Sequence, residues 1–373
     1  MRKRVFMILF AAVAVATVTG ATATAAPKRA AVFVQTNDPA GNQIAAYTRN
    51  SDGTLTRAGT YATGGNGGVE SGAVVDSLAS QGSLTYDAEH QLLFAVNAGS
   101  DSLSVFSVDG STLTLTQVVA SGGSFPTSVA AGGDLVYVLD AGGAGTVQGF
   151  RIAGSQLRPL HDGSRTLGLA NAVPPFFLSS PGQVGFSPDG SQLIVTTKGS
   201  TSSIDVFAVR SNGSLSDTPV ANAAATPAPF AFTFAPSGRL VVAEAGVNAV
   251  STYTLVADGT LSGAQSQTDG QAALCWVIAE GGNFYVANAG STTISGYRVD
   301  ANGTPTLIGS TGVVGHTEAG AIDIAASSDE RFLYAESGGA GTVDEFQVNS
   351  DGTLTKLGIV DGLPTGFEGI AST

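Results

Sequence analysis

The residues best suited to acid–base chemistry are His316 and Glu318, which lie two positions apart in the sequence. An imidazole titrates near neutral pH, so His316 beside a carboxylate is a candidate general base that activates water. The chain has 3 histidines. It contains no nucleophile elbow, zinc-ligand spacing, phosphate loop or dinucleotide fingerprint. The sequence therefore favours hydrolysis by an activated water over a covalent nucleophile, with His316 and Glu318 as the predicted catalytic residues.

Several glutamates form a second candidate set. Carboxylate oxygens are the ligands that a hard divalent cation such as Ca²⁺ or Mg²⁺ prefers. The glutamates expected to hold such an ion are Glu244, Glu318, Glu336 and Glu368. No spacing motif supports the ion, so solvated charge around an opening is the alternative interpretation.

These side chains must be positioned by strands. Residues 181–209 contain β-branched runs of four to six residues separated by Pro188–Gly190 and Lys198–Ser200, which predicts short antiparallel strands joined by tight turns. A further strand follows Asn212-Gly213. Four such strands make one blade of a β-propeller.

The third strand of this unit recurs along the chain. Its signature is a branched residue, an aromatic three positions later and a branched residue two positions after that. The aromatics lie 44 to 59 residues apart, a spacing that fits one blade each, and they are Tyr47, Phe106, Phe150, Phe207, Tyr253, Tyr297 and Phe346. The sequence therefore predicts an all-β fold, a seven-bladed β-propeller of four-stranded antiparallel blades.

The two ends of the repeat are expected to meet. Ala31–Thr36 matches a second strand, so the first blade lacks its inner strand. The segment Phe367–Ala371 is placed to supply that strand and to remove both open sheet edges. We expect residues 27–373 to form one propeller domain.

Propeller topology predicts which residues surround the mouth of the central channel. The inner strand begins on the same face on which the second strand ends. Carboxylates and amides are common at these points in a chain with 12% charged residues. The predicted binding residues at this mouth are Asn97, Asp140, Gln183, Lys198, Glu244, Asn288, Glu336 and Glu368. Two long connections, Ala62–Ser80 and His161–Ser180, emerge on this face, either as a lid over the channel or as simple surface loops.

Composition and charge restrict the compartment and the partners. Residues 1–26 combine Arg2–Arg4, an apolar run and a small-residue cleavage site near Ala25, which is typical of a secretory signal peptide. Cleavage would leave a secreted, extracellular or periplasmic protein with no membrane span. The formal charge of −13 disfavours nucleic acid as a partner, and we expect a monomer that binds a small molecule or a glycan.

The chain resembles the seven-bladed β-propeller lactonases, including 6-phosphogluconolactonase-like and carboxymuconate-cyclase-like proteins. The resemblance covers about Ala31–Thr373 and is carried by Pro181–Val184 with Phe186–Gly190, by Pro229–Phe232 and by Leu274–Val277. It implies hydrolysis of a lactone. Those relatives tend to place a histidine after a proline at the start of an inner strand, whereas this chain has Phe125-Pro126-Thr127-Ser128 there. An acidic mouth would also repel a phosphorylated sugar.

Two functions remain open from the sequence. The first is a secreted lactone hydrolase in which His316 or a glutamate activates water, and a cation or Lys198 stabilises the oxyanion. The second is a non-catalytic propeller that binds a ligand, a glycan or a protein at the same mouth. A closed pocket with a perturbed carboxylate near His316 would favour the enzyme, and a broad shallow surface with no shifted group would favour the binding protein.

Overall fold

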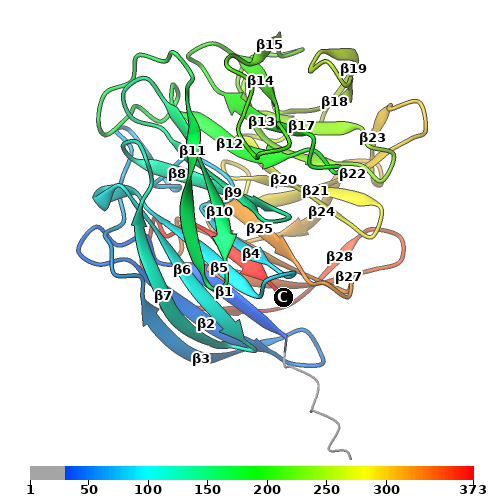
Figure 1. Ribbon diagram of the computed structural model, residues 1–373. Helices are drawn as coiled ribbons and strands as arrows, with labels where there is room; N and C mark the ends of the chain where they lie inside the picture. The colour runs from blue at the N-terminus through cyan, green and yellow to red at the C-terminus, as the bar shows by residue number, and fades with distance from the viewer. Residues whose placement is uncertain (1–29) are drawn as a thin grey trace, which may run out of the picture.

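The computed structural model describes residues 30–373, which form seven antiparallel sheets arranged in a ring (Figure 1). The predicted signal peptide lies outside the described residues. Within them the one helical element is the short 3-10 turn η1 (Ala98–Ser100). No helix in the described part of the chain is long and apolar enough to cross a membrane.

The first four blades each contain four strands, in order from the channel outward. Blade 1 contains β29 (Ile370–Ser372), β1 (Ala31–Gln35), β2 (Gln43–Arg49) and β3 (Leu55–Ala62). Blade 2 contains β4 (Leu84–Asp87), β5 (Leu92–Asn97), β6 (Ser102–Asp109) and β7 (Thr112–Ala120). Blade 3 contains β8 (Pro126–Gly132), β9 (Leu135–Asp140), β10 (Thr146–Ala153) and β11 (Gln156–Thr166). Blade 4 contains β12 (Pro181–Phe186), β13 (Gln192–Thr197), β14 (Ser203–Ala208) and β15 (Val220–Ala223).

The last three blades complete the ring. Blade 5 contains β16 (Pro229–Phe234), β17 (Leu240–Glu244), β18 (Ala249–Leu255) and β19 (Leu261–Thr268). Blade 6 contains β20 (Leu274–Glu280), β21 (Asn283–Asn288) and β22 (Thr293–Val299), and its outer edge is shared by β23 (Pro305–Leu307) and β24 (Val313–His316). Blade 7 contains β25 (Ala321–Ala326), β26 (Phe332–Ser337), β27 (Thr342–Val348) and β28 (Leu354–Val360).

The C-terminal strand closes the ring, as the sequence predicts. β29 pairs antiparallel with β1, with Ile370 opposite Val34 and Ser372 opposite Val32. Figure 1 shows this red end of the chain against the blue first strands. Because β29 pairs with β1, the inner edge of the first blade is covered by the chain's own end rather than left open.

The repeated aromatics anchor the packing between blades. All seven lie in the third strand of their blades, and none of them is more than 3% exposed. Each sheet is covered on both faces by its neighbours, so its central strands are apolar at successive positions. This explains why the blade count can be read from the sequence.

The two long connections meet above the channel. Ser71 pairs with Phe176 as an isolated parallel bridge, and the Ser180 hydroxyl donates to Glu70 Oε2 at 2.8 Å. β11 extends to Thr166, so the second connection is shorter than the sequence predicts and begins at residue 167. We call this face, on which the second strands end, the upper face.

Candidate functional site

The last residues of the second strands do not face the channel mouth. Asn97, Asp140, Glu244 and Asn288 are all 0% exposed. The side chains of three of them bond within or beside their own blade: Asn97 donates to Ser104 Oγ at 2.8 Å, Asn288 donates to Ser295 Oγ at 2.9 Å, and Glu244 accepts from the Tyr253 hydroxyl. Their sequence-predicted position at the mouth is therefore wrong. These three side chains tie the second strand to the third.

In blades 4 to 6 the next residue along the chain lines a cavity on the upper face instead, because side chains alternate in direction along a strand. The six positions that follow the second strands of blades 2 to 7 carry Ala98, Ala141, Lys198, Ala245, Ala289 and Gly338. Five of the six are small. Lys198 is the long side chain of this set, and it lines a cavity on the upper face.

Lys198 is buried although it carries a charge, with an exposed fraction of 3%. Its Nζ donates to the Ala79 carbonyl oxygen and lies 5.0 Å from the centre of the Phe230 ring. Burial lowers the pKa of Lys198, and the carboxyl groups of Glu70 and Asp76 oppose that shift. The ammonium is thus held among apolar groups by one carbonyl and by the charge of nearby acids.

Glu336 and Glu368 lie within the ring, near Asp76 and Asp323. Glu368 accepts the Leu78 N–H at 2.8 Å, and Glu336 accepts the Gly369 N–H at 3.1 Å. Glu368 and Asp76 also hydrogen-bond to each other through their carboxyl groups. Burial raises the pKa of Glu336 and of Glu368 well above the usual value, so burial favours the protonated form of both carboxyl groups.

His316 and Glu318 lie away from the channel. His316 ends β24 at the outer edge of blade 6 and pairs with Thr293 in β22. Glu318 is exposed, and its carboxylate pairs with Lys356 at 3.1 Å. The inner strand of blade 7 begins at Ala321, so the sequence-based placement of both residues at an inner-strand start is wrong. Their proposed acid–base role stays a prediction, and no contact with the channel supports it.

The four glutamates of the predicted cation site do not converge. Glu244 bonds to Tyr253 and Thr226 in blade 5, and Glu318 is on the surface, while Glu336 and Glu368 are buried in the ring. Within residues 30–373 no group of three or more His, Cys, Asp or Glu side chains is arranged to hold a metal ion. The residues present do not fit a Ca²⁺ or Mg²⁺ ion at this set.

The segment before β4 crosses the channel and divides it. Gln81 donates from Nε2 to the Val277 carbonyl at 3.0 Å and accepts the Val277 N–H on Oε1 at 2.9 Å, so it ties blade 2 to blade 6. The Trp276 indole donates to the Ser80 carbonyl at 2.8 Å. Asp76 accepts backbone N–H groups from Leu78 and Ala79 and fixes the turn that leads there. One cavity lies on either side of this plug.

The upper cavity has a volume of about 600 Å³ and lies under the two long connections. Its roof includes Val74 and Phe177, and its walls come from the turns of blades 4 to 6. Lys198, Asp76 and Cys275 are its ionisable groups, and most of the rest of the lining is apolar. Burial raises the pKa of the Cys275 thiol to about 12, so this cysteine is an inert thiol at neutral pH.

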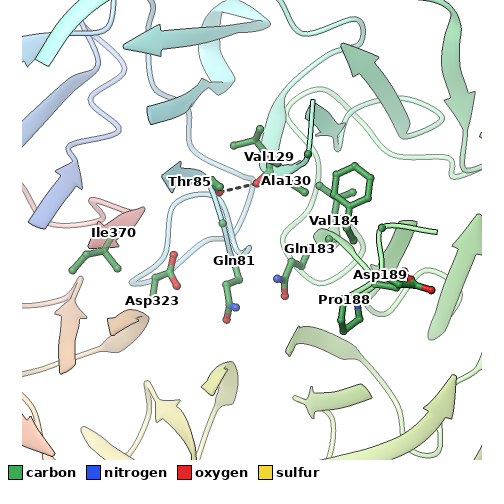
Figure 2. Close-up of a pocket in the computed structure, with 18 of the residues that line it drawn as sticks. Gln81, Thr85, Val129, Ala130, Gln183, Val184, Pro188, Asp189, Asp323 and Ile370 are labelled. Atoms are coloured by element: carbon green, nitrogen blue, oxygen red, sulfur yellow. Dashed lines mark hydrogen bonds between the residues drawn. The ribbon is translucent and has the colours of Figure 1, made fainter. Parts of the chain in front are cut away.

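The lower cavity has a volume of about 700 Å³ and is lined by the inner strands of several blades. Figure 2 shows the side chains of Gln81, Gln183 and Asp323 directed toward its central space. Of the residues that line it in the described chain, none is Lys, Arg or His. Free edges of inner strands add peptide N–H and carbonyl groups to the wall. The cavity is therefore rich in hydrogen-bonding groups and lacks a cation.

Asp323 and Gln183 are the candidate catalytic residues of the lower cavity. Burial raises the pKa of Asp323 to about 7, while the N–H groups of Ile324, Gly82 and Ile370 hold its carboxyl group in place. Gln183 accepts the Phe232 N–H on Oε1 at 2.6 Å, which fixes the amide and leaves Nε2 without a protein partner in the described chain. A carboxylate that titrates near neutral pH and an oriented N–H donor can serve as a general base and an oxyanion donor.

Sequence reasoning named Gln183, but at the mouth that holds Lys198 rather than in the lower cavity, and it missed Asp323 and Asp76. Asp323 stands in the apolar inner strand Ala321–Ala326, where a charged residue is unusual, and that contrast was a usable signal. Lys198 replaces alanine in a repeated pattern of the form x-Ala-Gly, seen at Asn97–Gly99 and Asn288–Gly290. Asp76 carries no such signal because its position depends on the path of a long connection.

Comparisons with known proteins agree with the seven-bladed propeller fold. Residues 40–156 match a family model described as lactonase, 7-bladed beta-propeller. A putative 6-phosphogluconolactonase from Bacteroides uniformis is 18% identical with a TM-score of 0.68, covering 93% of this chain and 100% of that chain. The periplasmic gluconolactonase from Pseudomonas aeruginosa is 17% identical with a TM-score of 0.68, covering 92% of this chain and 98% of that chain. No curated protein matches the chain. The resemblance to the seven-bladed propeller lactonases is confirmed, and at these identities the solved structures show the fold alone.

Proposed function

We propose, on the premise that this chain is similar to the seven-bladed propeller lactonases, that it hydrolyses a polyhydroxylated, unphosphorylated lactone in the lower cavity. The observation that carries the proposal is the Asp323 carboxyl group, which lines this cavity and has a pKa of about 7. A general base works best when its pKa lies near the working pH. The shape of the site also fits, because a cavity of about 700 Å³ is within the usual size for a small-molecule pocket.

The reaction uses one water and no covalent enzyme intermediate. The Asp323 carboxylate takes a proton from the water while the water oxygen bonds to the lactone carbonyl carbon. Gln183 Nε2 donates to the oxygen on which negative charge develops. The ring C–O bond then breaks, the released ring oxygen takes the proton from Asp323, and a hydroxy acid leaves. Asp323 returns to its starting charge.

The lining of the cavity supports an unphosphorylated sugar lactone. A phosphate would bring two negative charges beside Asp323 and Asp189, and the lining has no cationic side chain to pair with them. Hydroxyl groups instead match the mixture of carboxamides, carboxyl groups and peptide edges. The Pseudomonas aeruginosa neighbour is named a gluconolactonase, which favours the same class of substrate for this chain.

A lactone panel with a Gln183→Glu variant tests this proposal. Glutamate keeps the acceptor oxygen for the Phe232 N–H but loses the Nε2 donor, so we expect kcat on gluconolactone to fall by about 10²-fold with the fold intact. Gln192→Glu is the matched control, because Gln192 lies in the same blade as Gln183, bonds through Nε2 to the Val256 carbonyl of the next blade, and does not line the cavity. Rates are corrected for spontaneous hydrolysis. Wild-type turnover equal to the uncatalysed rate for every lactone would reject the proposal.

Binding without turnover is the second candidate. Three backbone N–H groups already bond to Asp323, which favours a carboxylate that holds the ring together over one that accepts a proton from water. A binding protein would show saturable calorimetric binding of the lactone or its hydroxy acid with no hydrolysis. This result would replace the enzyme with a sugar-binding propeller that uses the same cavity.

We further propose that the protein acts after export from the cytoplasm. The basic start and apolar run of residues 1–26 support this location. Expression of the full chain in a secreting bacterial host should yield a mature protein that begins near Ala26. N-terminal sequencing of the protein recovered from the culture medium and from the periplasm checks this result. Recovery of the protein only in the cytoplasm with residues 1–26 attached would contradict it.

A further inference from the structure

The upper cavity has a different chemistry from the lower one. Its lining residues are mainly alanine, valine, leucine and aromatic side chains, and it is separated from the lower cavity by the plug that contains Ser80 and Gln81. Two of its roof residues are exposed to solvent on their outer side, Val74 at 85% and Leu178 at 54%. Apolar surface therefore continues from the outside of the molecule into the cavity. Such a route suits an apolar ligand more than a sugar.

Lys198 can bind the polar head group of a ligand in this apolar cavity. Lys198 Nζ has three N–H donors, and its hydrogen bond to the Ala79 carbonyl uses one of them. No salt bridge joins Lys198 to a carboxylate within 4.0 Å among the described residues, although acids surround it at longer range. The ammonium can therefore donate to a further acceptor. A buried polar group of this kind fixes the orientation of a ligand whose remaining surface is apolar.

We propose that the upper cavity binds an acyl compound, with the hydrocarbon chain against the walls of blades 4 to 6 and the acyl oxygen accepting from Lys198. The roof residues Val75, Phe177 and Leu178 lie over the hydrocarbon chain of the ligand in this arrangement. A carboxylate and a neutral ester share the acyl oxygen that this site recognises. This binding site is independent of the lactone site in the lower cavity, since the plug lies between them.

The protein carries its own reporter for this site. Trp276 is the single tryptophan of the chain and lines the upper cavity. Bromine quenches indole fluorescence at short range, so ω-bromodecanoate bound in the cavity should quench the emission of Trp276 in a saturable manner. Unlabelled hexanoate, octanoate and decanoate should displace it, with affinity rising roughly fourfold for each added methylene. Methyl decanoate compared with decanoate shows whether the head group is recognised as an anion or as a neutral carbonyl.

Two variants test the geometry separately. Lys198→Met removes the ammonium and should weaken binding of decanoate by about 10-fold or more, whereas Lys356→Met on the surface should not change it. Ala245→Leu keeps Lys198 and fills part of the cavity, so decanoate should lose about 10-fold in affinity relative to hexanoate. Val118→Leu on the exposed outer strand β7 is its control.

The outcomes separate this site from the proposed lactone site. Saturable quenching that gluconolactone does not displace, and that Ala245→Leu weakens, supports the inference whether or not any lactone is hydrolysed. Absence of saturable quenching in the wild-type protein would overturn it. Displacement of the brominated acid by gluconolactone would also overturn it, because the two ligands would then share one site.

Discussion

Replacing Asp323 by asparagine is expected to lower kcat for sugar-lactone hydrolysis by about 10²–10⁴-fold. Asparagine has nearly the same shape and keeps an oxygen for the N–H group of Ile324, but it cannot take a proton from water. In the wild-type protein, a general base with a pKa of about 7 should make kcat/KM rise with pH and level off above that value. The variant should lose this rise along with the rate.

Asp205→Asn is the matched control for this experiment. Asp205 is also a buried aspartate with a raised pKa, but it bonds to Ser203 in β14 and does not line the lower cavity. We expect its activity to equal that of the wild type. Steady-state rates between pH 5 and 8, corrected for spontaneous hydrolysis, provide the measurement. Normal turnover by the Asp323→Asn protein would show that Asp323 is not the base.

Replacing Asp140 by asparagine is expected to stabilise the protein above neutral pH, against the usual direction of core substitutions. Asp140 is 0% exposed, and in the described chain the nearby Ser121 hydroxyl, which lies outside good hydrogen-bond geometry, is the one polar side chain that opposes its burial. Burial raises its pKa to about 7, with the nearby Ser121 hydroxyl opposing the shift, whereas the unfolded chain has the ordinary value of about 3.9. The folded protein must therefore either keep this carboxyl protonated or hold an unpaired charge.

The sign of the pH dependence follows from proton binding. Between about pH 4 and 7 the folded state binds the Asp140 proton more tightly than the unfolded state does. The contribution of Asp140 to the free energy of unfolding is thus highest below pH 4 and falls as the pH rises through 7. A pKa of about 7 in the folded state against the ordinary value in the unfolded chain corresponds to roughly 4 kcal/mol, so Asp140→Asn should raise the free energy of unfolding at pH 8.5 by about 2–4 kcal/mol.

Urea denaturation at pH 4.5 and pH 8.5 measures this difference. The two proteins should have similar stability at pH 4.5, because Asp140 is then protonated in the folded state and asparagine is neutral at both values. Asp52→Asn is the control, since Asp52 is on the surface and its bonds to Thr54 lower its pKa. It should give no gain at pH 8.5. A destabilised Asp140→Asn protein at that pH would contradict the predicted cost of burying this carboxylate.

The fold could be predicted from the sequence because one structural demand repeats in each blade. The aromatic of every third strand must fill the space between neighbouring sheets, and so Tyr47, Phe106 and their counterparts keep a fixed place in the pattern. Closure could also be predicted, because β1 begins where a second strand is expected and an unpaired edge needs a partner. Both inferences depend on backbone pairing, which tolerates small errors in strand boundaries.

The site could not be predicted to the same extent because side-chain direction reverses at every residue of a strand. An error of one position placed Asn97 and its counterparts at the expected mouth instead of Ala98 and its counterparts. Bulges at the inner-strand starts, such as that between Pro181 and Gln183, change the direction again. Glu318 was misplaced for another reason, since β24 adds an outer strand before the last blade begins.

A crystal structure of the Asp323→Asn protein with gluconolactone tests the central claim most directly. We predict the intact lactone in the lower cavity, with its carbonyl oxygen within hydrogen-bond distance of Gln183 Nε2 and its carbonyl carbon facing the position-323 side chain. A lactone bound in the upper cavity beside Lys198, or a lower cavity that contains only solvent at saturating lactone, would contradict it.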